Sequence, residues 1–285
     1  MHLENRVVLA AAGRVSRVIP GTRVDGVTRR EVRLGDGVSL RVCTPATASG
    51  AGLLWIHGGG LVLGAAAMDD RFCGETARDL GVTIASVDYR LAPRHPFPAA
   101  FNDVHRGWEW LTFHAGELGI STSRLAVGGQ SAGGGLAASL VQRLHDERAG
   151  VAAQWLFCPM LDDRTALNRA LDAEDHFVWN NRSNLVGWRS YLGAAFGQGE
   201  PPRYSVAARR AELSGLPPTW LYASDIELFH DEVVRYAERL RAAGVDTTLD
   251  VISGAPHGVE AWAPGSEPAR ALVARARHWL GGALA

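Results

Sequence analysis

The sequence lacks a strong excess of either charge. Its 285 residues include 29 lysine and arginine residues against 30 aspartate and glutamate residues, which leaves a net charge of −1. A chain that binds nucleic acid or an anionic membrane surface by electrostatic attraction usually carries a clear positive excess. The charge balance therefore favours neither a nucleic acid nor a membrane as a partner.

Cysteine is also scarce. The chain has three cysteines, Cys43, Cys73 and Cys158, which are far apart and odd in number. A disulfide framework needs paired cysteines, and a structural metal site needs ligands at short, characteristic spacings. We expect these residues to be small buried hydrophobic side chains, with no metal bound.

Long hydrophobic runs are absent as well. Near the N-terminus, residues 7–12 are apolar, but Gly13 and Arg14 interrupt the run. It is too short to span a bilayer, and no convincing cleavage region follows it. We therefore expect a cytoplasmic protein that does not associate with membranes.

No internal repeat or low-complexity linker divides the chain. Its residues are 47% hydrophobic and 21% charged, which are ordinary values for a globular protein. Proteins of the α/β class often form one domain at this length. The sequence thus predicts a single domain over residues 1–285.

Short apolar runs alternate with helical patterns along most of the chain. Two alternating runs, Thr28–Leu34 and Val38–Val42, flank a glycine-rich turn and predict a β-hairpin. Six apolar runs typical of buried strands follow: Leu53–Ile56, Val82–Val87, Leu125–Val127, Trp155–Phe157, Trp220–Tyr222 and Leu249–Ile252. Helical patterns lie near Met68–Leu80, Asn102–His114, Gly133–Glu147, His230–Ala243 and Pro268–Leu280. This alternation predicts a doubly wound α/β sheet.

Two segments do not follow the alternation. Residues 1–18 have the pattern of an amphipathic helix that ends before Pro20. Residues 172–199 are rich in tryptophan, asparagine and arginine, and they are long for a plain connection. We interpret this second segment as an insertion that covers the top of the sheet; the alternative is a surface helix that faces a partner.

The stretch Gly128–Gly135 holds the pattern G-x-S-x-G around Ser131, between an apolar run and a helical pattern. A serine at a sharp strand-to-helix turn sits in strained backbone, so its neighbours Gly129 and Gly133 must lack bulk. The turn leaves the N–H of Ala132 unpaired at the start of a helix. The alternative is a glycine-rich turn that only lets a helix pack on a strand.

A serine hydroxyl is a weak nucleophile unless a base accepts its proton and a third group orients that base. In one known arrangement of such catalytic residues along the chain, the serine comes first, the acid second and the histidine last. Five histidines follow Ser131: His145, His176, His230, His257 and His278. His257 lies in a loop directly after the last buried strand, where catalytic groups of α/β sheets gather. It is therefore the predicted base.

The acid is expected after the preceding strand, where several carboxylates lie close together. Asp231 and Glu232 are predicted to begin the next helix, where acidic groups favour the positive end of the dipole. Asp225 and Glu227 remain as candidates. Spacing alone does not separate these two residues.

Another glycine-rich turn follows the strand Leu53–Ile56. His57 is followed there by Gly58, Gly59 and Gly60. Glycines at this place allow backbone N–H groups to turn toward a developing negative oxygen without obstruction by a Cβ atom. A simple glycine turn is the alternative, but a second such turn in the correct chain order with His257 favours an oxyanion hole.

Four stretches together resemble the bacterial hormone-sensitive-lipase-like (family IV) esterases. They are His57–Gly60, Asp88–Pro93 with His95–Ala99, Gly129–Gly134 and Pro256–Gly258. The similarity runs from about Leu40 to the C-terminus. It implies an α/β-hydrolase fold with a small helical cap, formed by about residues 1–20 and 172–199.

The resemblance also implies roles for individual residues. Ser131 would be the nucleophile and His257 the base, while Gly58, Gly59 and Ala132 would supply the oxyanion N–H groups. The family places its catalytic Asp four residues before another Asp, and counting back from Asp231 gives Glu227. Glu227 is therefore the predicted acid, with Asp225 as the fallback.

The resemblance also bears on positions outside the predicted catalytic residues. The family often has Asp or Thr where Gln130 stands and Glu where Arg94 stands, so the support of the serine turn and the loop salt bridges are expected to differ. Residues 88–99 form a proline-fixed loop that we expect to hold the oxyanion loop in place. Within the cap, pocket lining and core packing both remain open for three aromatic residues, Phe177, Trp179 and Trp188.

The sequence thus predicts a serine carboxylesterase that acts on a small-molecule ester through an acyl-enzyme, without a metal or organic cofactor. Short acyl chains are expected, because no long apolar lid is present. An amidase or deacetylase with the same machinery and a non-catalytic binding protein on the same scaffold are the alternatives. The oligomeric state, a homodimer included, remains open.

Overall fold

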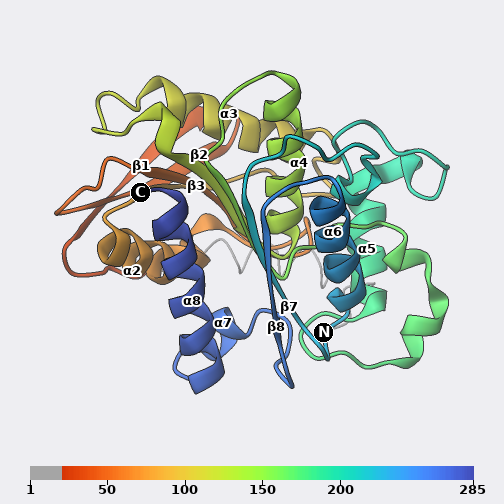
Figure 1. Ribbon diagram of the computed structural model, residues 1–285. Coiled ribbons are helices and arrows are strands. Elements are labelled where there is room, and N and C mark those ends of the chain that lie inside the picture. The colour runs from red at the N-terminus through yellow and green to blue at the C-terminus, as the bar shows by residue number, and fades with distance from the viewer. Residues whose placement is uncertain (1–20) are drawn as a thin grey trace.

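The computed structural model describes residues 21–285 and contains one eight-stranded sheet (Figure 1). The strands are β1 (Val27–Gly35), β2 (Val38–Pro45), β3 (Gly52–Ile56), β4 (Thr83–Asp88), β5 (Leu125–Gln130), β6 (Ala153–Phe157), β7 (Thr219–Ser224) and β8 (Thr247–Ile252). Their order in the sheet is β1-β2-β4-β3-β5-β6-β7-β8. Each of the six apolar runs noted in the sequence lies wholly or almost wholly within a strand.

The N-terminal strands pair differently from the rest. β1 and β2 form the predicted antiparallel hairpin, and β2 also runs antiparallel to β4. All other neighbours, from β4 through β3 to β8, are parallel. The carboxyl ends of these six strands therefore meet at one edge of the sheet, where loops from β3, β5, β7 and β8 can converge.

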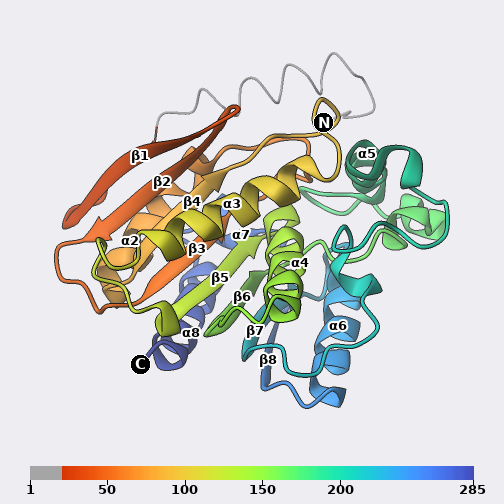
Figure 2. The same ribbon diagram turned by 90° about the horizontal axis from the view of Figure 1, so that it is seen from above.

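Helices cover both faces of the sheet (Figure 2). The α-helices are α2 (Asp70–Leu80), α3 (Ala99–Phe113), α4 (Ala132–Asp146), α5 (Asn181–Leu192), α6 (His230–Ala242), α7 (Val259–Trp262) and α8 (Glu267–Ala283). Short 3₁₀ helices lie at Ala66–Asp69, Thr122–Arg124, Thr165–Leu167, Arg169–Ala173, Gly193–Ala195 and Ala207–Arg209. None of the helices in the described chain is long and apolar enough to cross a membrane.

Two hydrophobic cores result, one on each face. Buried residues of α3, α4 and α6 pack on one face of the sheet, and buried residues of α2 and α8 pack on the other. Along β3 the side chains alternate between the cores: Leu54 and Ile56 enter the first, and Leu53 and Trp55 the second. All five residues of β3 are buried, which explains why the strand is continuously apolar.

The segment between β6 and β7 contains α5 and packs on the loop after β3. Gly187 of α5 comes so close to this loop that an added Cβ would lie 2.7 Å from the Gly60 carbonyl oxygen. Gly187 therefore places α5, which lies within residues 172–199, against the glycine-rich turn after β3. Residues 1–20, the other part of the expected cap, lie outside the described residues.

Glu232 links α6 to the segment after β6, which the sequence did not predict. Asp231 and Glu232 do lie in the first turn of α6, but the Glu232 side chain is buried and does not face solvent at the helix end. Its carboxylate accepts hydrogen bonds from the N–H groups of Leu161, at 2.6 Å, and Asp162, at 3.3 Å. It also accepts one from the Thr165 hydroxyl.

Burial raises the pKa of Glu232 to about 8, although the hydrogen bonds from Thr165 and Leu161 oppose that rise. The folded chain therefore binds a proton at Glu232 between about pH 4.5 and about pH 8, where the unfolded chain has released it. This contribution to stability is complete at low pH and is lost as the pH rises through that window.

We predict that Glu232→Gln weakens the pH dependence of stability. The free energy of unfolding of the parent should decrease between about pH 5 and about pH 8.5. This decrease should be larger than that of the variant by about 1 kcal/mol or more. Urea unfolding at the two pH values measures this difference. Glu238→Gln, an exposed position on the same helix, is the matched control and should behave as the parent. Equal pH dependence in all three proteins would contradict the prediction.

Candidate active site

Ser131 lies at the sharp turn between β5 and α4. Its backbone angles, φ 55° and ψ −121°, are strained for a residue with a side chain. An added Cβ at Gly133 would overlap the carbonyl oxygens of Ile56 and His57, and one at Gly129 would overlap the Gly133 carbonyl. The turn thus requires glycine on both sides of the serine, as the motif predicted.

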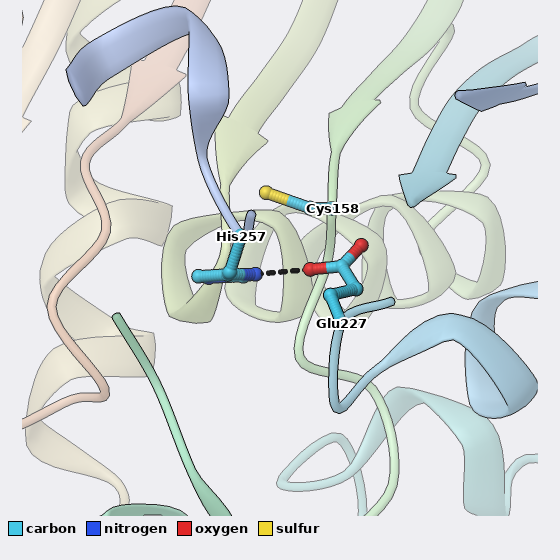
Figure 3. Close-up of side chains that lie close together, drawn as sticks. All are labelled: Cys158, Glu227 and His257. Atoms are coloured by element: carbon cyan, nitrogen blue, oxygen red, sulfur yellow. Dashed lines mark hydrogen bonds and ion pairs between the residues drawn. The ribbon is translucent and has the colours of Figure 1, made fainter. Parts of the chain in front are cut away.

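Ser131, His257 and Glu227 form a continuous hydrogen-bonded line. The Ser131 hydroxyl lies 2.8 Å from His257 Nε2, and His257 Nδ1 bonds the Glu227 carboxylate. Figure 3 shows the imidazole and the carboxylate facing each other from two different loops. With a proton on Nδ1 donated to Glu227, Nε2 is free to accept the serine proton. All three side chains are almost completely buried.

The Glu227 carboxylate is held by a second contact. Its other oxygen accepts a hydrogen bond from the Ser224 backbone N–H at 2.9 Å. The Ser224 hydroxyl in turn donates to the Ala255 carbonyl, in the loop that carries His257. The Phe229 ring packs edge-on against the imidazole, with 5.2 Å between ring centroids. These contacts fix both members of the pair.

Asp225, the fallback acid, occupies a different place. Its carboxylate accepts hydrogen bonds from the Ser253 hydroxyl, at 2.6 Å, and the Gly254 N–H, at 2.7 Å. These hydrogen bonds lower the pKa of Asp225. Asp225 therefore braces the loop before His257, while Glu227 contacts the imidazole itself.

Three residues were predicted to supply the oxyanion N–H groups: Gly58, Gly59 and Ala132. Gly58 is so close that an added Cβ would lie 3.3 Å from Ser131 Cβ. Gly59 has φ +114°, a backbone conformation that only glycine adopts readily. In the described part of the chain, the N–H groups of Gly58, Gly59 and Ala132 donate no hydrogen bond. They are thus available to a ligand oxygen.

Residues 88–99 brace the loop after β3, as expected. The Tyr89 ring stacks on His57 with 4.2 Å between centroids, and its hydroxyl donates to the His57 carbonyl at 3.0 Å. The Ala92 N–H donates to the Leu61 carbonyl further along the same loop. Arg94, the position that departs from the family pattern, is exposed. None of these contacts involves the reacting groups.

The three cap aromatics have different surroundings. Phe177 is 74% exposed. Trp179 is buried and packs against Gly60, where an added Cβ would overlap its ring. Trp188 is buried in the core and packs against Tyr191, with 6.2 Å between ring centroids. Of the three, Trp179 is therefore the residue in contact with the glycine-rich loop.

Cys158, Glu227 and His257 place their donor atoms within 4.8 Å of one another. Cys158 lies beside the histidine–carboxylate pair in Figure 3. Burial raises the pKa of the Cys158 thiol well above its usual value. The imidazole of His257 and the carboxylate of Glu227 are hydrogen-bonded to each other. The cluster is better explained as a buried thiol packed beside this pair.

A cavity of about 720 Å³ lies next to Glu227. It is lined mainly by polar and charged side chains, among them Asp162, Arg164, His176, Glu227 and Arg235. Ser131 and His257 are not among its lining residues. The cavity is thus adjacent to the hydrogen-bonded line, and Ser131 does not line it.

Two residues near the site were missed in the sequence. Ser224 is the last residue of β7. Its N–H contact with Glu227 is a backbone interaction, which cannot be recognised from the residue type. Glu260 lies three residues after His257 and accepts a hydrogen bond from Gln130 at 2.6 Å. Its position in the histidine loop was the only available signal, and an acid at the start of a short helix usually faces solvent.

Comparison with known proteins places this site in context. A family model described as "alpha/beta hydrolase fold" matches residues 53–261. The chain is 34% identical to an ethyl acetate hydrolase of Pseudomonas putida, over 75% of this chain and 67% of that protein. It is 32% identical to esterase LipI of Mycobacterium tuberculosis, over 77% of this chain and 68% of that protein. A solved bacterial heroin esterase superimposes with a TM-score of 0.86 at 37% identity, covering 98% and 90% of the two chains.

The close packing around the serine turn leads to a prediction. Gly133→Ala should lower the free energy of unfolding by about 2 kcal/mol or more, because the new methyl group overlaps the carbonyl oxygens of Ile56, the last residue of β3, and His57. Gly116→Ala is the matched control, since nothing lies within 4 Å of an added Cβ there. It should change stability by less than about 0.5 kcal/mol. Chemical denaturation measures both, and equal tolerance at the two positions would rule out the close approach.

Proposed function

Since this chain belongs to the hormone-sensitive-lipase-like family of α/β-hydrolase-fold esterases, we propose that it hydrolyses carboxylic esters through a Ser131–His257–Glu227 triad. The observation that carries the proposal is the buried hydrogen-bonded line from Glu227 to Ser131. A serine hydroxyl gains nucleophilicity only when a base is oriented beside it, and this line supplies that orientation.

The first half of the reaction forms the acyl-enzyme. Ser131 Oγ attacks the ester carbonyl carbon while its proton moves to His257 Nε2. The carbonyl oxygen becomes negatively charged and accepts hydrogen bonds from the N–H groups of Gly58, Gly59 and Ala132. Collapse of this intermediate breaks the bond to the alcohol, which leaves with the proton from His257.

The second half of the reaction hydrolyses the acyl-enzyme and regenerates the free enzyme. A water molecule gives a proton to His257 Nε2 and attacks the acyl carbon, and the same N–H groups stabilise the second oxyanion. Collapse breaks the bond to Ser131 Oγ, which recovers its proton from His257. The carboxylic acid product then dissociates.

Glu227 keeps the imidazole in the required tautomer and stabilises the imidazolium that forms in both halves. Its second hydrogen bond, from the Ser224 N–H, prevents the carboxylate from turning away. The carboxylate thus already faces the imidazole before the reaction begins, so little reorganisation is needed in the transition state.

We propose short acyl esters as the substrates. The name of the Pseudomonas putida relative, an ethyl acetate hydrolase, indicates activity on a two-carbon acyl group in that protein. Trp179 packs on Gly60, so a bulky indole lies against the proposed oxyanion loop. Amides share the same machinery and differ only in the leaving group, so amide turnover belongs in the same test.

The test compares the purified protein with Ser131→Ala. We expect p-nitrophenyl acetate and butyrate to be turned over faster than long-chain esters, with an initial burst of p-nitrophenol that reports the acyl-enzyme. Ser131→Ala should lose activity by about 1,000-fold or more. p-Nitroacetanilide, the matching amide, should be a poorer substrate than the acetate ester.

Two results would contradict the proposal. Wild-type turnover by Ser131→Ala would exclude Ser131 as the nucleophile. Faster turnover of the anilide than of the acetate ester would favour an amidase over an esterase.

A further inference from the structure

Gln130 lies directly before the nucleophile and touches the two other loops of the site. Its Oε1 atom lies 3.1 Å from the position of an added Cβ on Gly58, in the oxyanion loop. Its Nε2 atom lies 3.2 Å from the same position on Gly258, in the histidine loop. One side chain therefore fills the space between three segments that the reaction must hold together.

Glu260 is the hydrogen-bond partner of Gln130. It lies in α7, three residues after His257, and its side chain is almost completely buried. Glu260 Oε1 accepts from Gln130 Nε2 at 2.6 Å, and Oε2 accepts from the Tyr222 hydroxyl. The residue that precedes the nucleophile is thus tied to the segment that carries the base.

Both oxygens of Glu260 accept hydrogen bonds, and such contacts favour the ionised form of a buried carboxylate. Burial raises the pKa of Glu260, and the hydrogen bonds from Tyr222 and Gln130 and the charge of His257 oppose that rise. The last contribution means that a negative Glu260 and a positive His257 stabilise each other.

Other titratable groups also face this carboxylate. Tyr222 comes from β7, and Cys158, 3.3 Å from the Tyr222 hydroxyl, comes from the end of β6. Burial raises the pKa of Asp69, before α2, to about 7, and the charge of Glu260 adds to that rise. Glu227 faces His257 from the loop after β7. Among these groups, His257 is the one that gains a positive charge in the proposed reaction, when it accepts the Ser131 proton.

We propose that Glu260 and Gln130 are positioning residues for the reaction. Their hydrogen bond fixes the His257 loop against the Ser131 turn, and the Glu260 carboxylate favours the protonated imidazole. The proposal rests on the triad assigned above and adds a second carboxylate to it. Glu227 acts on His257 through direct contact, and Glu260 acts through its charge and its link to the serine turn.

The arrangement has a mechanical consequence. Ser131 and His257 come from distant parts of the chain and are joined directly by one hydrogen bond, which must break and re-form during turnover. The Gln130–Glu260 contact joins the same two segments through atoms that take no part in proton transfer. The distance between nucleophile and base therefore stays fixed while their own hydrogen bond changes.

The charge is tested with Glu260→Gln. This variant keeps the shape of the side chain and removes its charge, so the imidazolium loses support. The acidic limb of the kcat/KM profile, which reports protonation of His257 in the free enzyme, should move down by about half a pH unit. Glu267→Gln, the same exchange at an exposed position of α8, is the control and should keep the parent profile.

The positioning is tested with Gln130→Met, which has similar length but no amide. We expect kcat for p-nitrophenyl acetate to fall about tenfold with KM little changed, because the reacting atoms lose their fixed separation. A purely structural role would lower thermal stability without moving the acidic limb in Glu260→Gln. If Gln130→Met does not fold, the pH profile of the isosteric Glu260→Gln still tests whether the pair has a positioning role.

The proposal would be overturned if the acidic limb of Glu260→Gln lay at the same pH as in the parent protein. It would also be overturned if a folded Gln130→Met kept the kcat of the parent. Failure of the proposed function has a different signature. It would appear as wild-type activity in Ser131→Ala, measured with the same substrate. The two outcomes are therefore distinguishable in one set of assays.

Discussion

The hydrogen bond between the Glu227 carboxylate and His257 Nδ1 is the interaction on which the site depends. It joins two loops that follow different strands, β7 and β8, and it sets which imidazole nitrogen faces Ser131. Both partners are buried, so water does not compete for the contact. The surrounding structure holds the partners: Ser224 orients the carboxylate, and Phe229 packs on the ring.

Parallel strands bring these loops together. The turn after β5 holds Ser131, the loop after β3 holds the proposed oxyanion glycines, and the loops after β7 and β8 hold the proposed acid and base. All four strands run in one direction, so their carboxyl ends meet at one edge. The inserted segment with α5 then packs over the oxyanion loop through Gly187. Sheet topology thus determines where the reacting groups lie.

Much of this arrangement could be predicted from local sequence. The six apolar runs marked the strands correctly because a strand buried on both faces must be apolar throughout. The serine turn was predictable because Gly129 and Gly133 reflect a steric requirement of the backbone. The choice of Glu227 over Asp225 came from a family resemblance, since spacing alone left both open. The structure shows that Glu227 contacts the imidazole and that Asp225 caps the neighbouring turn.

Long-range burial explains what could not be predicted. Glu232 looked like a solvent-facing acid at a helix start, yet its carboxylate accepts hydrogen bonds from a segment about 70 residues away. Glu260 contacts Gln130 across 130 positions of the sequence. The sequence around Trp188 was equally compatible with pocket lining and with core packing. In the structure, Trp188 is part of the hydrophobic core. In each case the partner is defined by the folded chain and has no local signature.

The most direct test of the account is the rate at which an organophosphate labels Ser131. Diethyl p-nitrophenyl phosphate phosphorylates an activated serine, and mass spectrometry of the digested protein locates the label. One label per chain is expected, on the peptide that contains Ser131, with a rate that falls about 100-fold or more in Glu227→Gln and stays near the parent value in Asp225→Asn. A label at another residue, or a loss of rate in Asp225→Asn with none in Glu227→Gln, would contradict the account.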